Sequence, residues 1–99
     1  MASREARTGA PETAESVVLV VDDEPDVASV TATYLERHLD GVAVTVESGG
    51  TNAIDRLEDN IDCVVSDYEM PDIDGLELLR RIRQRDADIP FILFTARGS

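Results

Sequence analysis

Four short apolar runs divide this chain. Each is rich in Val, Ile, Leu or Phe and is bounded by polar residues, Gly or Pro, which is typical of buried strands. They predict strands at residues 17–21, 42–46, 63–66 and 89–95. Between these runs the apolar residues recur three and four positions apart, which predicts that helices connect the strands.

The helical spacing occurs in three segments. The first begins with acids and Pro25, the second follows the Ser and Gly residues at 48–50, and the third runs from about Leu76 to Arg85. Pro near the first turn and Ser or Gly before it are common signals for the start of a helix. The inner faces are predicted to consist, in chain order, of Val27, Val30, Tyr34 and Leu35; of Ala53, Ile54 and Leu57; and of Leu78, Leu79 and Ile82.

Strands and helices alternate from residue 17 onward. Because the connections are short, this alternation implies right-handed crossovers and a parallel sheet with helices on both faces, so the fold class is predicted to be α/β. The 99 residues suffice for one domain. Residues 1–16 lack apolar periodicity and are predicted to be a disordered leader, which leaves residues 17–99 for the domain.

Acidic residues stand where two of the apolar runs end. Asp22 and Asp23 follow the first run, and Asp67 follows the third. The carboxyl ends of the strands form the ligand crevice of an open parallel sheet, so these carboxylates are expected to converge. Crowded carboxylates repel one another unless a cation offsets their charge, and their oxygens suit Mg²⁺. The alternative is that the acids only complement the dipoles of the following helices.

The composition is strongly acidic. There are 21 Asp and Glu residues against nine basic ones, all of them Arg, and the formal net charge is −12. This balance argues against a nucleic-acid-binding surface. A lysine-free acidic surface also suggests adaptation to high salt, where ions screen the self-repulsion, although an ordinary acidic protein is the alternative.

The remaining chemistry-bearing residues favour structural roles. The single cysteine, Cys63, cannot form an internal disulfide, and its apolar run predicts a small core residue. His38 is expected on the surface of the first helix, and Glu77 is expected to pair with Arg81 one turn later. No stretch is long and apolar enough for a membrane span or a signal peptide, so the protein is predicted to be cytoplasmic.

The segment "DIDG" at residues 72–75 is similar to part of a calcium-binding loop. Aligning Gly75 with the glycine of such a loop puts Met70 at the first ligand position and Arg81 at the last. Neither side chain suits calcium. The segment is therefore predicted to be a turn into a helix.

Three motifs together resemble the receiver domain of two-component response regulators. They are "VLVVDDEPD", "VVSDYEMPDIDGLELLRRIR" and "FILFTA", and they occur in the family's order and spacing over residues 17–99. The resemblance implies a flavodoxin-like sheet, here with strand order 2-1-3-4. It also implies a phosphoacceptor signalling module, which is not an enzyme beyond its own phosphorylation and dephosphorylation. A histidine kinase would be its phosphodonor, and an output domain or partner protein would lie outside this chain.

The same resemblance assigns roles to individual residues. Asp67 would accept the phosphoryl group, and Mg²⁺ would be held by Asp67, Asp23 and the backbone carbonyl of Glu69, with Asp22 acting directly or through water. Thr95 would be the switch hydroxyl that binds a phosphoryl oxygen. A β-branched residue that merely ends a strand is the alternative for Thr95.

The family's pattern continues beyond the fourth strand with another helix, a fifth strand and a last helix. This chain therefore resembles a C-terminally truncated receiver, without the lysine that ends the fifth strand. The fourth strand would then be an exposed apolar edge, which predicts exchange or a dimer. The run "ILFTARGS" is similar to receivers of salt-loving archaea.

Two other functions stay open at this point. The missing lysine makes an interaction module without phosphotransfer plausible. A magnesium-dependent phosphohydrolase that forms an aspartyl-phosphate is the third hypothesis. Such enzymes typically carry a D-x-D pair after the first strand, and Glu24 breaks that motif here.

Overall fold

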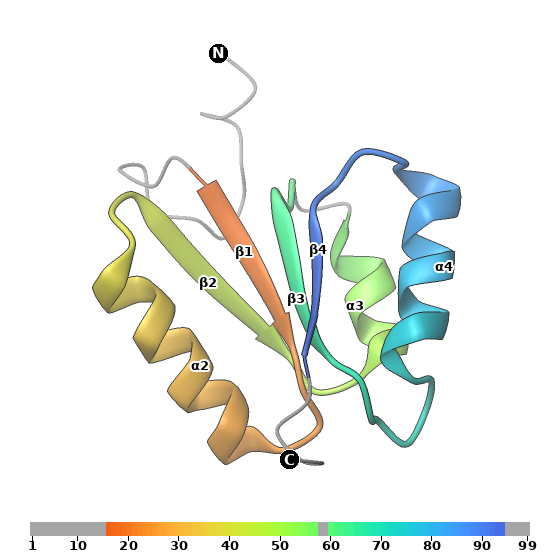
Figure 1. Ribbon diagram of the computed structural model, residues 1–99, viewed down its shortest axis with the longest axis horizontal. Coiled ribbons are helices and arrows are strands. Elements are labelled where there is room, and N and C mark those ends of the chain that lie inside the picture. The colour runs from red at the N-terminus through yellow and green to blue at the C-terminus, as the bar shows by residue number, and fades with distance from the viewer. Residues whose placement is uncertain (1–15, 58–59, 95–99) are drawn as a thin grey trace.

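The computed structural model describes residues 16–57 and 60–94. Three helices surround one sheet of four strands (Figure 1). In chain order the elements are β1 (Ser16–Val21), α2 (Pro25–His38), β2 (Val42–Glu47), α3 (Gly50–Arg56), β3 (Cys63–Asp67), α4 (Gly75–Arg85) and β4 (Phe91–Phe94). The predicted elements are thus present, with ends that shift by one or two residues. Ser16 belongs to β1, whereas residues 1–15 of the predicted leader lie outside the described part.

All strand pairs in the sheet are parallel, and the strand order is β2-β1-β3-β4. The predicted order and the α/β class are therefore confirmed. The chain leaves β1 toward β2 and later returns past β1 to β3. The gap between the carboxyl ends of β1 and β3 is therefore the point where the strand order reverses, which is where ligands bind in open α/β sheets.

The helices cover the two faces of the sheet separately, with α2 on one side and α3 and α4 on the other (Figure 1). Side chains alternate along β1, so Val17, Leu19 and Val21 face the α3 and α4 side while Val18 and Val20 face α2. Leu19 and Val20 are fully buried. The inner strand β1 is therefore apolar on both faces, as its continuous run of Val and Leu predicts.

The inner face of α2 differs from the prediction. Val30 and Tyr34 are 69% and 60% exposed, whereas Ala28 is buried and Leu35 packs against the sheet. Ala28 and Leu35 are seven residues apart and so share one face of the helix. The face that packs on the sheet thus carries the small side chain of Ala28, and the larger side chains of Val30 and Tyr34 point away from it. The prediction was wrong for Val30 and Tyr34 and right for Leu35.

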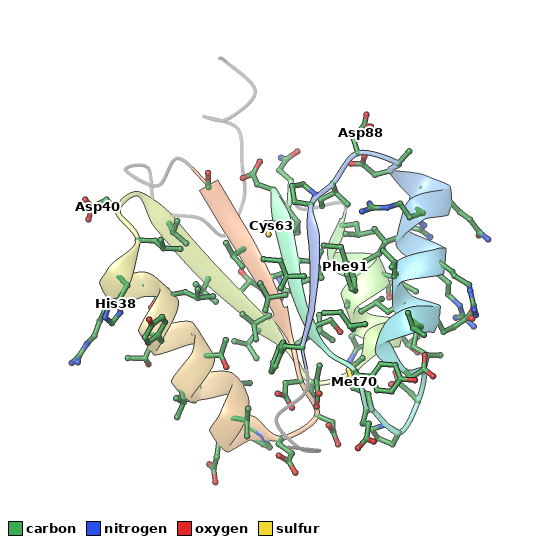
Figure 2. All side chains as sticks on the ribbon, viewed as in Figure 1. His38, Asp40, Cys63, Met70, Asp88 and Phe91 are labelled. Carbon is green, nitrogen blue, oxygen red and sulfur yellow. The ribbon has the colours of Figure 1, made fainter. Side chains whose placement is uncertain are left out.

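Several other structural predictions are confirmed, whereas Leu79 and Cys63, which were predicted to be core residues, are only half-buried. Leu78 and Ile82 are fully buried in α4, and Glu77 accepts hydrogen bonds from Arg80 and, at 3.0 Å, from Arg81. His38 is exposed at the end of α2 and stacks on Tyr34 (Figure 2). The segment 72–75 is a turn in which the Asp74 side chain caps α4 by accepting a hydrogen bond from the Glu77 amide. Cys63 is half-buried against the cluster under α2.

Candidate metal site

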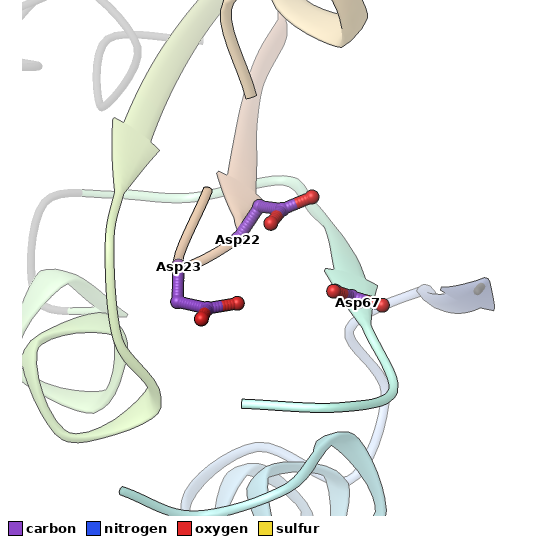
Figure 3. Close-up of side chains that lie close together, drawn as sticks. All are labelled: Asp22, Asp23 and Asp67. Atoms are coloured by element: carbon purple, nitrogen blue, oxygen red, sulfur yellow. The ribbon is translucent and has the colours of Figure 1, made fainter. Parts of the chain in front are cut away.

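Three carboxylates converge at the carboxyl edge of the sheet. Asp67 is the last residue of β3, and Asp22 and Asp23 directly follow β1. The register pairs Val21 with Ser66, so the residues that follow these positions meet. One oxygen from each of the three carboxylates lies within 4.8 Å of the other two, and the side chains surround one space between the strand ends (Figure 3).

These carboxylates are buried without enough hydrogen-bond donors. Asp22 is 1% exposed and Asp67 is 3% exposed. Asp22 Oδ2, Asp23 Oδ1 and Asp67 Oδ1 are buried and accept no hydrogen bond. Burying a charged group without a partner costs on the order of several kcal/mol of folding free energy. The arrangement therefore requires a compensating positive charge or a proton.

The pKa of Asp22 shows the same imbalance. Burial raises the pKa of this carboxyl group, and the hydrogen bond from the Glu24 amide to Asp22 Oδ1, at 2.9 Å, opposes that effect. The negative charges of Asp67 and then Asp23 raise the pKa further, so the net shift is upward. Asp22 therefore holds its proton more tightly than an exposed Asp does until a cation joins the site.

The donor set and its spacing fit Mg²⁺. All three ligand groups offer oxygen, which hard cations prefer. The three oxygens lie within 4.8 Å of one another, so one cation would reach all three once the carboxylates close around it. A pocket of about 260 Å³, lined by Asp23, Glu69, Met70 and Pro71, opens beside them and leaves room for water or a phosphoryl group.

The remaining predicted site residues are Glu69 and Thr95. Glu69 has an exposed side chain and lies two residues after Asp67, where it lines the pocket with Asp23. Thr95 lies outside the described residues. The described part of β4 ends at Phe94, which pairs with Asp67 in the register and whose carbonyl accepts a hydrogen bond from the Tyr68 amide at 2.8 Å.

Gly75 is a site-positioning residue that the sequence reasoning treated only as part of a turn. A Cβ atom at this position would lie 2.6 Å from the Asp67 carbonyl oxygen and 2.4 Å from Leu93 Cδ1. The start of α4 can therefore approach the backbone of Asp67 only because Gly75 has no side chain. The sequence gives no local signal for this role, because a glycine at the start of a helix is common.

Comparison with known proteins identifies the family. Residues 18–99 match the response regulator receiver domain family. The chain belongs to this family. The receiver domain is 38% identical over 80 residues to the response regulator SaeR of Staphylococcus aureus, a match that covers 81% of this chain and 34% of SaeR. The chain thus spans about a third of the length of this curated relative.

Solved structures agree with this assignment. The response regulator TrrA from Thermotoga maritima in complex with Mg²⁺-BeF has a TM-score of 0.77 and 34% identity, covering 84% of this chain and 71% of TrrA. TrrA in complex with the histidine kinase ThkA has a TM-score of 0.75 at 34% identity, covering 85% of this chain and 72% of that chain.

SaeR and TrrA come from Staphylococcus aureus and Thermotoga maritima, so these relatives do not support the predicted origin from a salt-loving archaeon. Within residues 16–57 and 60–94, no helix is long and apolar enough to cross a membrane.

Proposed function

We propose that this receiver domain is a phosphoacceptor in which Asp67 takes a phosphoryl group from a histidine kinase. The observation that carries the proposal is the set of three converging carboxylates with buried, unpartnered oxygens at the carboxyl edge of the sheet. Two structures of one relative support it, because TrrA is solved with Mg²⁺-BeF and with the histidine kinase ThkA.

The proposal assigns a role to each residue of the site. A carboxylate oxygen of Asp67 attacks phosphorus while the P–N bond of a phosphohistidine breaks, and the released histidine nitrogen keeps the electron pair and takes a proton from solvent. Asp22, Asp23, Asp67 and the Glu69 backbone carbonyl would hold Mg²⁺. When bound, Mg²⁺ neutralises charge on the carboxylates and on the phosphoryl oxygens. The chain itself contributes an oriented nucleophile at the end of a rigid, central strand.

The signalling part of the proposal concerns residues and partners beyond this site. The hydroxyl of Thr95 is proposed to bind a phosphoryl oxygen and to draw its loop inward, so that the modified surface changes how an output domain or partner protein binds. The domain is proposed to work in the cytoplasm, where it would meet its histidine kinase. It is proposed to catalyse no reaction beyond its own phosphorylation and dephosphorylation. Its net charge of −12 argues against direct nucleic-acid binding.

A second candidate function is protein interaction without phosphotransfer. Exposed apolar residues on β4 favour it, since Ile92 is 54% exposed and Leu93 is 37% exposed on a strand that pairs only with β3 among the described elements. An apolar edge of this kind can pair with another chain, which includes a second copy of this one. The phosphohydrolase hypothesis gains nothing from the geometry, because Glu24, at the second acidic position of the D-x-D motif, is exposed and is not among the three converging carboxylates.

The deciding experiment is phosphorylation with a small donor. The folded protein would be incubated with Mg²⁺ and acetyl phosphate, and its intact mass would be measured. We expect one phosphoryl adduct, and Asp67→Asn should abolish it. Asp74→Asn should retain the adduct, because Asp74 lies in the loop after β3 but outside the carboxylate cluster. The absence of an adduct on folded protein that binds Mg²⁺ would favour the interaction module instead.

A further inference from the structure

Asp72 ties the loop that follows β3 to the start of α3. Its Oδ2 accepts hydrogen bonds from the amide and the hydroxyl of Thr51, both at 2.9 Å, and its Oδ1 accepts one from the Gly50 amide at 3.3 Å. These contacts span 21 and 22 positions in the sequence. A single carboxylate thus adds three hydrogen bonds to the packing of Ile73 against the start of α3.

The surroundings of Asp72 are shaped for this contact. A Cβ at Gly49 would lie 3.0 Å from Asp72 Oδ2, and a Cβ at Gly50 would lie 2.4 Å from Ile73 Cγ1. The two glycines thus leave the space that Asp72 and Ile73 fill. Burial acts to raise the pKa of Asp72, but hydrogen bonds from Thr51, Ile73 and Gly50 outweigh it and lower the pKa to about 2. The carboxylate is therefore ionised at neutral pH.

The other end of the loop is fixed as well. The Tyr68 amide donates to the Phe94 carbonyl and the Gly75 amide donates to the Tyr68 carbonyl, each at 2.8 Å. Residues 69–71 lie between these anchors and Asp72, and with Asp23 they line the pocket beside the three carboxylates. Without Asp72 the loop would lose its hydrogen bonds to α3, while the buried side chain of Met70 and the contacts of Tyr68 would remain.

We infer that Asp72 is a positioning residue that sets the backbone of Glu69 against Asp23 and Asp67 and so tunes the affinity of the site for Mg²⁺. It acts through the loop and is not itself part of the carboxylate cluster. This inference rests on the proposed function. Supporting groups around a metal site typically change its affinity by 10-fold to 100-fold when removed, and we expect about a tenfold effect here because the carboxylates themselves stay in place.

Asp72→Ala tests the inference, with Asp74→Ala as its matched control. Asp74 also lies in this loop and also caps a helix, through the Glu77 amide at 2.8 Å, but it does not reach α3. The Kd for Mg²⁺ would be measured by calorimetry on folded protein. We expect about a tenfold weaker Kd for Asp72→Ala and less than a twofold change for Asp74→Ala.

Phosphorylation kinetics provide a second measurement that a general loss of stability would not reproduce. With acetyl phosphate, Asp72→Ala should need about tenfold more Mg²⁺ for half-maximal rate while it reaches a maximal rate close to that of the unaltered chain. Asp72→Asn, which keeps one acceptor oxygen for Thr51, should give an intermediate Kd. It also decides the question if Asp72→Ala does not fold.

Hydrogen exchange separates the possible failures. If the Thr51 amide loses protection in Asp72→Ala while the Kd for Mg²⁺ is unchanged, the contact is purely structural and the inference is overturned. An equal loss of affinity in Asp74→Ala would also overturn it. If the unaltered chain binds no Mg²⁺, the proposed function fails, and this result is visible before any variant is compared.

Discussion

Asp22 is the residue in which folding and function conflict most directly. It is 1% exposed, its Oδ2 has no hydrogen-bond partner, and its pKa is raised by burial and by the charges of Asp67 and Asp23. A carboxyl group whose pKa is raised by folding stabilises the folded state below its unfolded pKa, which is near 3.8, and this benefit is lost as the pH rises through the folded pKa. At neutral pH without metal, ionised Asp22 therefore opposes folding.

Asp22→Asn should consequently stabilise the metal-free protein. The Asn side chain keeps the oxygen that accepts from the Glu24 amide, and its NH₂ group replaces an unpartnered oxygen with a donor beside two carboxylates. We expect the free energy of unfolding at pH 7 in EDTA to rise by about 1 kcal/mol, as judged by urea unfolding. The advantage over the unaltered chain should shrink as the pH falls toward 4.

Magnesium should reverse this order of stability. The melting temperature of the unaltered chain should rise with Mg²⁺ concentration, because an ion that binds only the folded state stabilises it by mass action. The melting temperature of Asp22→Asn should respond much less. Equal responses in the two proteins would show that Asp22 does not take part in the metal site.

At the scale of secondary-structure elements, the position of the site depends on how closely α4 approaches β3. The first residue of α4, Gly75, sits against the Asp67 carbonyl, and its amide donates to the Tyr68 carbonyl at 2.8 Å. The helix thus supports the backbone that carries the proposed phosphoacceptor. Its buried face, with Leu78 and Ile82, holds it on the sheet.

Gly75→Ala should destabilise the fold, although Gly to Ala within a helix normally stabilises by up to about 1 kcal/mol. The added Cβ would meet a backbone oxygen at 2.6 Å, which the structure can relieve only by moving α4 or β3. We expect a loss of about 1–3 kcal/mol in urea unfolding. Leu76→Ala, at the next position and 40% exposed, should change the stability by less than about 1 kcal/mol. A more stable Gly75→Ala variant would contradict the close contact.

The same elements show how far the sequence predicts this structure. The strands, the strand order and the meeting of Asp22, Asp23 and Asp67 follow from local apolar runs and from the geometry of parallel sheets. The exposed side chains of α2 do not, because they depend on which face of the helix packs on the sheet, and that face carries Ala28 and Leu35. The role of Asp72 depends on a contact 21 residues away, which no local pattern encodes.

At the scale of the whole molecule, the charge is the first property that acts everywhere at once. A net charge of −12 on 99 residues creates repulsion that the compact state increases. Salt shortens the range of this repulsion from about 10 Å at 0.1 M to about 3 Å at 1 M. The melting temperature should therefore rise by several degrees between these concentrations of NaCl in EDTA.

A variant with fewer charges provides the control for this salt effect. Asp40→Asn combined with Asp55→Asn removes two acids from exposed positions outside the carboxylate cluster. Its melting temperature should respond less to salt than that of the unaltered chain. A melting temperature that is independent of salt would instead favour the interpretation as an ordinary acidic protein without salt adaptation.

The second property of the whole molecule is the asymmetry between the two edges of its sheet. The edge strand β2 packs against α2 and exposes one apolar side chain, Val46, whereas the edge strand β4 exposes two, Ile92 and Leu93. A charged residue on an edge strand prevents pairing with another chain. Ile92→Lys should therefore abolish any concentration-dependent association measured by sedimentation, with a stability change of about 0.5 kcal/mol or less because the side chain is already 54% exposed.

Val46→Lys on β2 is the matched control for this edge, because Val46 is 40% exposed on the opposite edge strand. If association requires β4, Val46→Lys should associate like the unaltered chain while Ile92→Lys stays monomeric. If both substitutions weaken association equally, general surface hydrophobicity is the cause, and β4 has no special role. An unaltered chain that stays monomeric at all concentrations would rule out the proposed dimer and leave the edge for a partner of different sequence.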